Sequence, residues 1–395
     1  MNLLVRSEIA VVLDDATFER VLNIYPEEEL AKKPAFAVAL QNGQIEFKTL
    51  MDEAGRILIP WQMFFLDPTN LDAELSRIER LRHRASRRLL SKRRGSGSIT
   101  SKRILDRLVR CQTYLSENHA NKSSNRFCGS LKRQSVADAV LTMLEHFAID
   151  MDAFRRKNKR DALAYLVEKI EGGAVNVCQG VLTNKILPHL KASRSVYKNT
   201  SGFVIHDEHF PFAFIPSEIN PDEREGRQIF TLAFLVALIG LDAYEYQMEQ
   251  DFKVSLLKAR GLRRKAYDIV TELLLPFGHT ALLEGAPITF ETRDHLSRRY
   301  KLTPTAVVVI LKKRGLISTA EYEDLLPTPT PGGGKSVART PSIDLSVRKF
   351  NGKYAFEYIN ADFASQKVTA VQMQYLLFGA INKKGFKQYK AKLGL

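Results

Sequence analysis

The stretch 226–238, GRQIFTLAFLVAL, opens the most continuous apolar run of the chain. The apolar residues continue to Leu241, so the run from Ile229 is well short of the roughly 20 residues that would span a bilayer. An apolar run of this length is typical of a helix that is buried on most of its surface. We therefore expect a core helix here, and no membrane anchor.

Two short apolar segments precede this helix and are predicted to pair as strands. They are 202–205 (GFVI) and 212–216 (FAFIP), joined by a polar turn over 206–209. Downstream, 294–315 has the pattern of a helix, a tight turn and a second helix. The central part of the chain is thus predicted to combine a small sheet with several helices.

This order of strands, loop and helix resembles the ImmA/IrrE family of zinc metallopeptidases. In that family the helix ends in RFTLAHELGH, where HExxH places two zinc-binding histidines one turn apart with a glutamate base between them. The family pattern is matched here by Arg227, Phe230, Thr231, Leu232 and Ala233. The positions of the two histidines and the glutamate are occupied by Phe234, Leu235 and Leu238.

Two further segments carry the same resemblance. The helix 263–276 is similar to the family's ExxAxxFAxxLLMP, whose first glutamate is the third zinc ligand, and Arg263 stands at that position. The segment 294–318 is similar to LAxxFxVSxxALxxRLxxLGLIS, matched through Leu296, Tyr300, Leu302, Ala306, Leu316, Ile317 and Ser318. The resemblance therefore runs from about Phe203 to Ser318 and implies a zincin-like fold.

The departures from the family remove its zinc chemistry. Zinc needs nitrogen, sulfur or carboxylate donors, and hydrolysis needs an activated water. Phe234 and Leu238 offer no lone pairs, lie on one helix face, and would fill the space of the metal. Arg263 is a fixed cation that would repel zinc. We therefore expect no catalytic residue, no metal and no cofactor at this site.

The positive charge of the chain is concentrated in one segment. The formal net charge is +15, and 77–110 contains thirteen Lys/Arg against only Glu79 and Asp106. Such a density favours an anionic polymer as partner, although a solvated helical face or an acidic protein partner would also explain it. The predicted nucleic-acid-binding residues are Arg77, Arg80, Arg84, Arg87, Arg88, Lys92, Arg93, Arg94, Lys102 and Arg103.

The first 70 residues are predicted to be helical. Phe47, Leu50, Met51 and Ala54 have helical spacing, and a short helix is expected between Pro60 and Pro68. The exit IPWQMFFLD resembles the tail of the Cro/repressor-type helix-turn-helix that is commonly fused ahead of ImmA/IrrE domains. No clean recognition helix precedes it.

The expected fold class is α+β and predominantly α, with a zincin-like core, a helical N-terminal region and a helix-turn-helix-like segment after the core. In the tail, 354–358 is predicted as a strand and 369–377 as a helix. The predicted divisions are a repressor-like module (1–70), a basic helical arm (71–130), the core (131–325), a Pro/Gly linker (326–343) and a small C-terminal unit (344–395).

The remaining candidate metal donors are histidines and cysteines. Cys111, Cys128 and Cys178 form no CxxC pair, which disfavours a disulfide framework or a cysteine zinc site. His206 and His209 lie three apart in the predicted turn, where a solvated turn is favoured over a metal site. No signal peptide pattern is found, and the cytoplasm is expected.

These observations predict a catalytically inactive ImmA/IrrE-like regulatory protein of a mobile element, prophage or stress circuit. It would bind DNA, a repressor-type or antitoxin-type partner, or both, and no membrane. One alternative is a zinc metallopeptidase that cleaves a repressor with displaced ligands such as His206 and His209. Another is a toxin or phage-defence interaction protein, for example of a toxin–antitoxin pair, that need not contact DNA. The sequence does not predict the oligomeric state.

Overall fold

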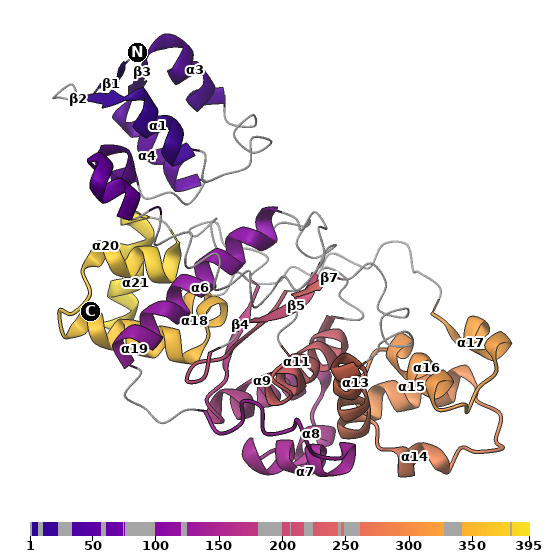
Figure 1. The fold of residues 1–395 in the computed structure, drawn as a ribbon. Helices are drawn as coiled ribbons and strands as arrows, with labels where there is room; N and C mark the ends of the chain where they lie inside the picture. The colour runs from indigo at the N-terminus through magenta and orange to yellow at the C-terminus, as the bar shows by residue number, and fades with distance from the viewer. Residues whose placement is uncertain are drawn as a thin grey trace.

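The fold is seen in a computed structural model, which is mostly helical with two small sheets (Figure 1). The α+β class with a predominance of helix is therefore confirmed. The structure describes residues 2–6, 11–22, 34–56, 61–73, 75, 99–119, 125–180, 200–205, 207–216, 224–243, 246–248, 261–327, 342–379 and 381–395.

A four-stranded mixed sheet lies at the centre of the larger part of the molecule. Its strand order is β4-β6-β5-β7, in which β4 is parallel to β6 and β5 is antiparallel to both β6 and β7. Phe203 of β5 lies opposite Phe214 of β6, so the predicted hairpin is confirmed. The strands are β4 (Asn176–Gln179), β5 (Thr200–Ile205), β6 (Phe212–Ile215) and β7 (Tyr246–Met248).

One face of this sheet is covered by α11 (Arg224–Gly240), which contacts both β5 and β6. Alternate strand residues such as Val204 and Ala213 point to this side and join its apolar core. Every residue of 228–241 is buried, which confirms the predicted core helix. Helices α9 (Lys159–Gly172) and α13 (Gly261–Leu274) pack on α11.

The opposite face of the sheet is covered by α6 and by the C-terminal helices (Figure 1). Phe203, Phe212 and Phe214 point to this side and form a second core with them. The five divisions expected from the sequence stay a prediction, but α6 and the C-terminal helices here share one sheet with the predicted core. These helices are α6 (Ile99–His119), α18 (Ile343–Asn351), α19 (Lys353–Ala364), α20 (Ala370–Met373), the π-helix η3 (Gln374–Phe378) and α21 (Lys383–Leu393).

The prediction of a strand at 354–358 is wrong, because these residues lie within α19. Tyr354 and Tyr358 are four residues apart and stack with ring centroids 6.3 Å apart, as helical neighbours do. A short run of aromatic residues fits either period, and the tertiary packing decides between them.

The N-terminal region contains a sheet as well as helices, so the prediction of a helical region is incomplete. Strand β1 pairs antiparallel with β2 and parallel with β3. The predicted amphipathic helix is confirmed as α4, where Leu50 and Ala54 are buried. The elements are β1 (Asn2–Arg6), β2 (Val11–Asp14), α1 (Asp15–Leu22), α3 (Pro34–Asn42), β3 (Gln44–Glu46), α4 (Phe47–Arg56) and the 3-10 helix η1 (Trp61–Phe65).

The segment after α13 has the predicted succession of helix, turn and helix. The Thr303 hydroxyl caps α16 by accepting a hydrogen bond of 3.0 Å from the Ala306 amide. Residues 306–311 of α16 are all buried, whereas a helix that reads a DNA groove needs an exposed face. The helices are α14 (Phe277–Ala281), α15 (Phe290–Arg299), α16 (Pro304–Lys313) and α17 (Thr319–Leu325); α7 (Val136–His146) and α8 (Met151–Arg156) precede α9.

No helix among the described residues is both long and apolar enough to cross a lipid bilayer.

Gly202 allows α11 to approach the sheet closely. Its φ is 147°, in a region that favours glycine, and the pairing of β5 with β7 is irregular at this residue. A Cβ atom at this position would lie 2.5 Å from the Phe214 carbonyl oxygen and 2.9 Å from the Leu235 Cδ1 atom.

Gly202→Ala is therefore expected to lower the free energy of unfolding by about 2 to 4 kcal/mol, through backbone strain and overpacking. The control is Gly278→Ala in α14, where a Cβ would meet nothing within 4 Å. That change should be neutral or stabilise by up to about 1 kcal/mol. Chemical denaturation measures both, and an unchanged midpoint for Gly202→Ala would contradict the close helix–sheet contact.

Candidate functional site

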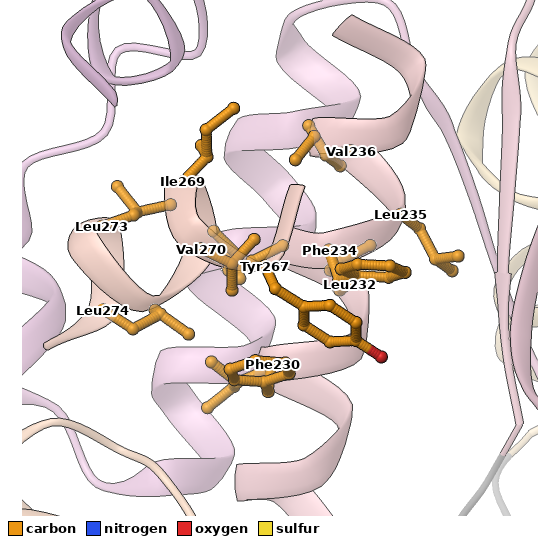
Figure 2. Close-up of a cluster of buried hydrophobic side chains, with 14 of the residues drawn as sticks. Phe230, Leu232, Phe234, Leu235, Val236, Tyr267, Ile269, Val270, Leu273 and Leu274 are labelled. Atoms are coloured by element: carbon orange, nitrogen blue, oxygen red, sulfur yellow. The ribbon is translucent and has the colours of Figure 1, made fainter. Parts of the chain in front are cut away.

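The three positions that the resemblance assigns to zinc chemistry lie in the centre of the core. Phe234 is 2% exposed, Leu235 0% and Leu238 1%. The Phe234 ring stacks on Tyr267 of α13, with centroids 4.3 Å apart and planes inclined by 28° (Figure 2). Phe230, one turn earlier on α11, stacks on the same Tyr267 ring at 6.2 Å.

Leu235 points away from this aromatic stack, toward the sheet. Its Cδ1 atom lies against Gly202 of β5. Figure 2 shows the same division, with Phe234 next to Tyr267 and Leu235 on the other side of the helix. The side chains at 234 and 235 thus take part in two different packing contacts, one with α13 and one with the sheet.

Arg263 lies in the first turn of α13 and is half-buried. The centre of its guanidinium group is 6.0 Å from the Tyr267 ring centroid. Tyr267 therefore contacts both Phe234 and Arg263. In the resemblance these two residues stand at positions of two zinc ligands. The sequence offered one signal for Tyr267, its spacing of four residues from Arg263 on the same helix.

The buried hydrophobic side chains of α11 and α13 that Figure 2 shows present carbon atoms and one hydroxyl group, that of Tyr267. Within the part of the chain that the structure describes, no group of three or more His, Cys, Asp or Glu side chains gathers in a way that could hold a metal ion. A close-packed apolar centre of this kind contributes stability and shape.

The turn between β5 and β6 is anchored by Asp207. Its Oδ1 atom accepts hydrogen bonds of 2.8 Å from the backbone amides of His209 and Phe210, and its Oδ2 atom accepts one of 2.7 Å from the Ser116 hydroxyl of α6. The His209 Nδ1 atom lies 3.9 Å from the Asp207 carboxylate. His206 is outside the described residues. These contacts fit a turn held against α6 by its aspartate.

Most of the predicted nucleic-acid-binding residues cannot be placed. Lys102 and Arg103 lie in the first turns of α6, and their side chains are not described. The remaining eight residues lie outside the described residues: Arg77, Arg80, Arg84, Arg87, Arg88, Lys92, Arg93 and Arg94.

Arg107 of the same basic segment is buried instead of facing solvent, with 2% of its surface exposed. Its Nη2 atom donates to the Asn351 side-chain oxygen at 3.2 Å and to the Leu377 carbonyl, and the guanidinium lies 4.3 Å from the Phe350 ring centroid. Its Nε and Nη1 atoms have no hydrogen-bond partner among the described residues. Burial lowers the pKa of Arg107 to about 9, so it keeps its charge at neutral pH.

Two asparagines extend this buried contact from α6 to the sheet. The Asn176 side chain of β4 donates to the Asn351 carbonyl at 2.6 Å and accepts from the Tyr354 amide at 2.9 Å. Burial also raises the pKa of the Cys111 thiol, to about 11, which disfavours its reactive thiolate. The polar contacts therefore join α6, β4 and the C-terminal helices, and they do not form a reactive site.

Sequence reasoning missed this role of Arg107 because it counted the residue among the surface cations. The signal was present in the spacing of Ile104, Leu108, Cys111 and Leu115, all of which are buried. Arg107 falls on the same helix face, at i+3 from Ile104 and i−4 from Cys111.

In comparisons with known protein families, curated proteins and solved structures, the chain matches none. The ImmA/IrrE resemblance therefore depends on the motifs between residues 203 and 318.

Phe234→Ala should lower the free energy of unfolding by about 3 to 5 kcal/mol, because it opens a cavity and removes the stack with Tyr267. The matched control is Phe290→Ala, at a residue that is 55% exposed, where less than about 1 kcal/mol should be lost. Urea denaturation of the full chain measures the change in the free energy of unfolding for both substitutions. Equal effects of the two changes would show that Phe234 does not occupy the core described here.

Proposed function

We propose that this chain is a non-catalytic regulatory protein, with an ImmA/IrrE-like scaffold, that associates with nucleic acid through its basic residues. The single observation that carries the proposal is the apolar packing of Phe234, Leu235 and Leu238, at the positions of the family's two zinc-binding histidines and its glutamate base. Side chains buried to this degree fill the volume that a metal and its water would need.

The basic segment 77–110 supports nucleic acid as the partner. Arg107 is accounted for by the protein core, so it is not proposed to contact the partner. The burial of α16 disfavours groove reading by the segment after the core, so binding is proposed to act on phosphates through charge. Affinity of this kind varies little with sequence and falls steeply with salt.

The resemblance also supports a setting for this function. Repressor-fused ImmA/IrrE proteins are associated with mobile elements, prophages, toxin–antitoxin pairs and stress regulation. We propose the same setting here, in the cytoplasm, with a repressor-like or antitoxin-like protein as a second partner that is held without being cleaved.

Replacing Arg80, Arg84, Arg87 and Arg88 by Gln should weaken binding to a mixed-sequence DNA duplex. Each lost phosphate contact reduces the magnitude of the slope of log affinity against log salt by about 0.9. The four changes should therefore make the slope less steep by about 3 to 4. Fluorescence anisotropy of a labelled duplex between 50 and 200 mM salt gives the slope.

The control replaces four exposed lysines of α21, Lys383, Lys384, Lys387 and Lys392, by Gln, which changes the net charge equally. It should retain most of the slope. Absence of duplex binding by the unaltered chain at low salt would contradict the proposed function, and so would equal effects of the two sets of changes.

A further inference from the structure

Two basic segments that are far apart in the sequence meet on the surface of the folded core. One is 155–160 (RRKNKR), at the junction of α8 and α9, and the other is 298–301 (RRYK), at the end of α15. Their exposed members are Arg156, Arg160, Arg298 and Arg299, which we call the core basic surface.

A buried tyrosine holds the two segments together. Tyr300 is 2% exposed, and the guanidinium centres of Arg155 and Arg299 lie 5.4 and 5.7 Å from its ring centroid. The Tyr300 hydroxyl in turn contacts the His279 Nδ1 atom at 2.8 Å. The Lys159 ammonium donates to the Ser297 hydroxyl at 3.2 Å, which ties the start of α9 to α15. The charges are therefore placed by fixed contacts between elements.

The positive charge of this surface is not neutralised within the described part of the chain. None of its four arginines has a described carboxylate within ion-pairing distance. Of the aspartates near the first segment, Asp152 pairs with Arg155 at 3.6 Å, and Asp161 accepts from the Asn158 side chain at 2.7 Å. A third, Asp150, accepts hydrogen bonds from two backbone amides of α8, which lower its pKa, and the charge of Arg156 lowers that pKa further. Folding thus gathers like charges, which repel one another unless an anion binds.

Further cations lie beside this surface, of which Arg348 pairs with Glu171 at 3.3 Å and Lys301 is only 8% exposed. Burial lowers the pKa of Lys349 in α18, and the nearby charges of Arg160 and Arg348 lower it further, which places these residues close together. At the other segment, the Lys301 ammonium is tied to the Arg298 carbonyl at 2.9 Å.

The chemistry of the surface favours phosphate over an acidic protein or an anionic membrane. Its exposed side chains are arginines, whose planar guanidinium groups bind phosphate through two parallel hydrogen bonds. The one aromatic ring of the two segments, Tyr300, is buried, so it supplies no apolar anchor of the kind found in protein interfaces and membrane-bound helices.

We propose that the core basic surface binds the sugar-phosphate backbone of a nucleic-acid duplex, as a contact separate from the basic segment 77–110. The proposal rests on the proposed function for the class of partner, but it does not depend on the family resemblance. The core would then fix the orientation of the duplex, while the segment 77–110 adds affinity.

The test replaces Arg156, Arg160, Arg298 and Arg299 by Gln in the full chain and measures binding to a mixed-sequence DNA duplex. The magnitude of the slope of log affinity against log salt should fall by about 3 to 4. Between 50 and 200 mM salt, the unaltered chain should therefore lose about 100-fold more affinity than the variant. The four-lysine variant of α21 has the same net charge and should retain most of the slope.

A second variant separates charge from folding. Replacement of the same four arginines by Lys keeps the charge and should keep the slope, whereas a general disturbance of the surface would lower affinity in both variants. An equal loss of affinity in the Gln variant and the Lys variant, with the slope of log affinity against log salt unchanged in both, would overturn the proposal.

The remaining outcomes distinguish the two proposals. If the Arg80, Arg84, Arg87 and Arg88 variant loses salt slope while the core variant behaves like the α21 control, the proposed function stands and the core contact is overturned. If the unaltered chain binds no duplex but its core arginines are needed to bind polyglutamate or anionic lipid vesicles, both are overturned.

Discussion

The contact on which the larger part of the structure depends is the packing of α11 between the sheet and α13. Gly202 lets Leu235 lie against β5, and Phe234 stacks on Tyr267 from the opposite side. The two contacts hold the helix between two layers of apolar side chains, and each excludes water. The positions that the resemblance assigns to zinc chemistry are here part of the hydrophobic core.

The second face of the sheet is held in a different way, around a buried charge. Among the described residues, the Arg107 guanidinium is held by the Asn351 side-chain oxygen, the Leu377 carbonyl and the Phe350 ring, and it has no carboxylate partner. A buried charge whose Nε and Nη1 atoms find no hydrogen-bond partner in the described part of the chain lowers the stability of the contact relative to an apolar side chain of the same size. It also fixes which helices meet, because the acceptors that the described residues present to it come from Asn351 of α18 and Leu377 of η3.

The sequence predicted the elements with a strong local period. The apolar run 226–238 indicated α11, and the two short apolar segments 202–205 and 212–216 with a polar turn between them indicated the hairpin. Prediction from the sequence failed where the pattern was short. Strands β1 to β3 have only three to five residues each, and 354–358 fits the period of a strand as well as that of a helix. The core basic surface joins residues about 140 positions apart, and such a contact follows from tertiary packing that no local pattern records.

The central claim is that the space between α11 and α13 is filled by apolar side chains and binds no metal. The most direct test is thermal unfolding of the full chain with excess Zn²⁺ and with a chelator. A metal-free core predicts the same Tm in both. A bound metal at 100 times its Kd would add about 2.7 kcal/mol of stability, and Tm would rise by several degrees. A rise of that size that persists in His209→Ala but is lost in Tyr267→Phe would contradict the claim, because the second change removes the hydroxyl group at the contact between α11 and α13.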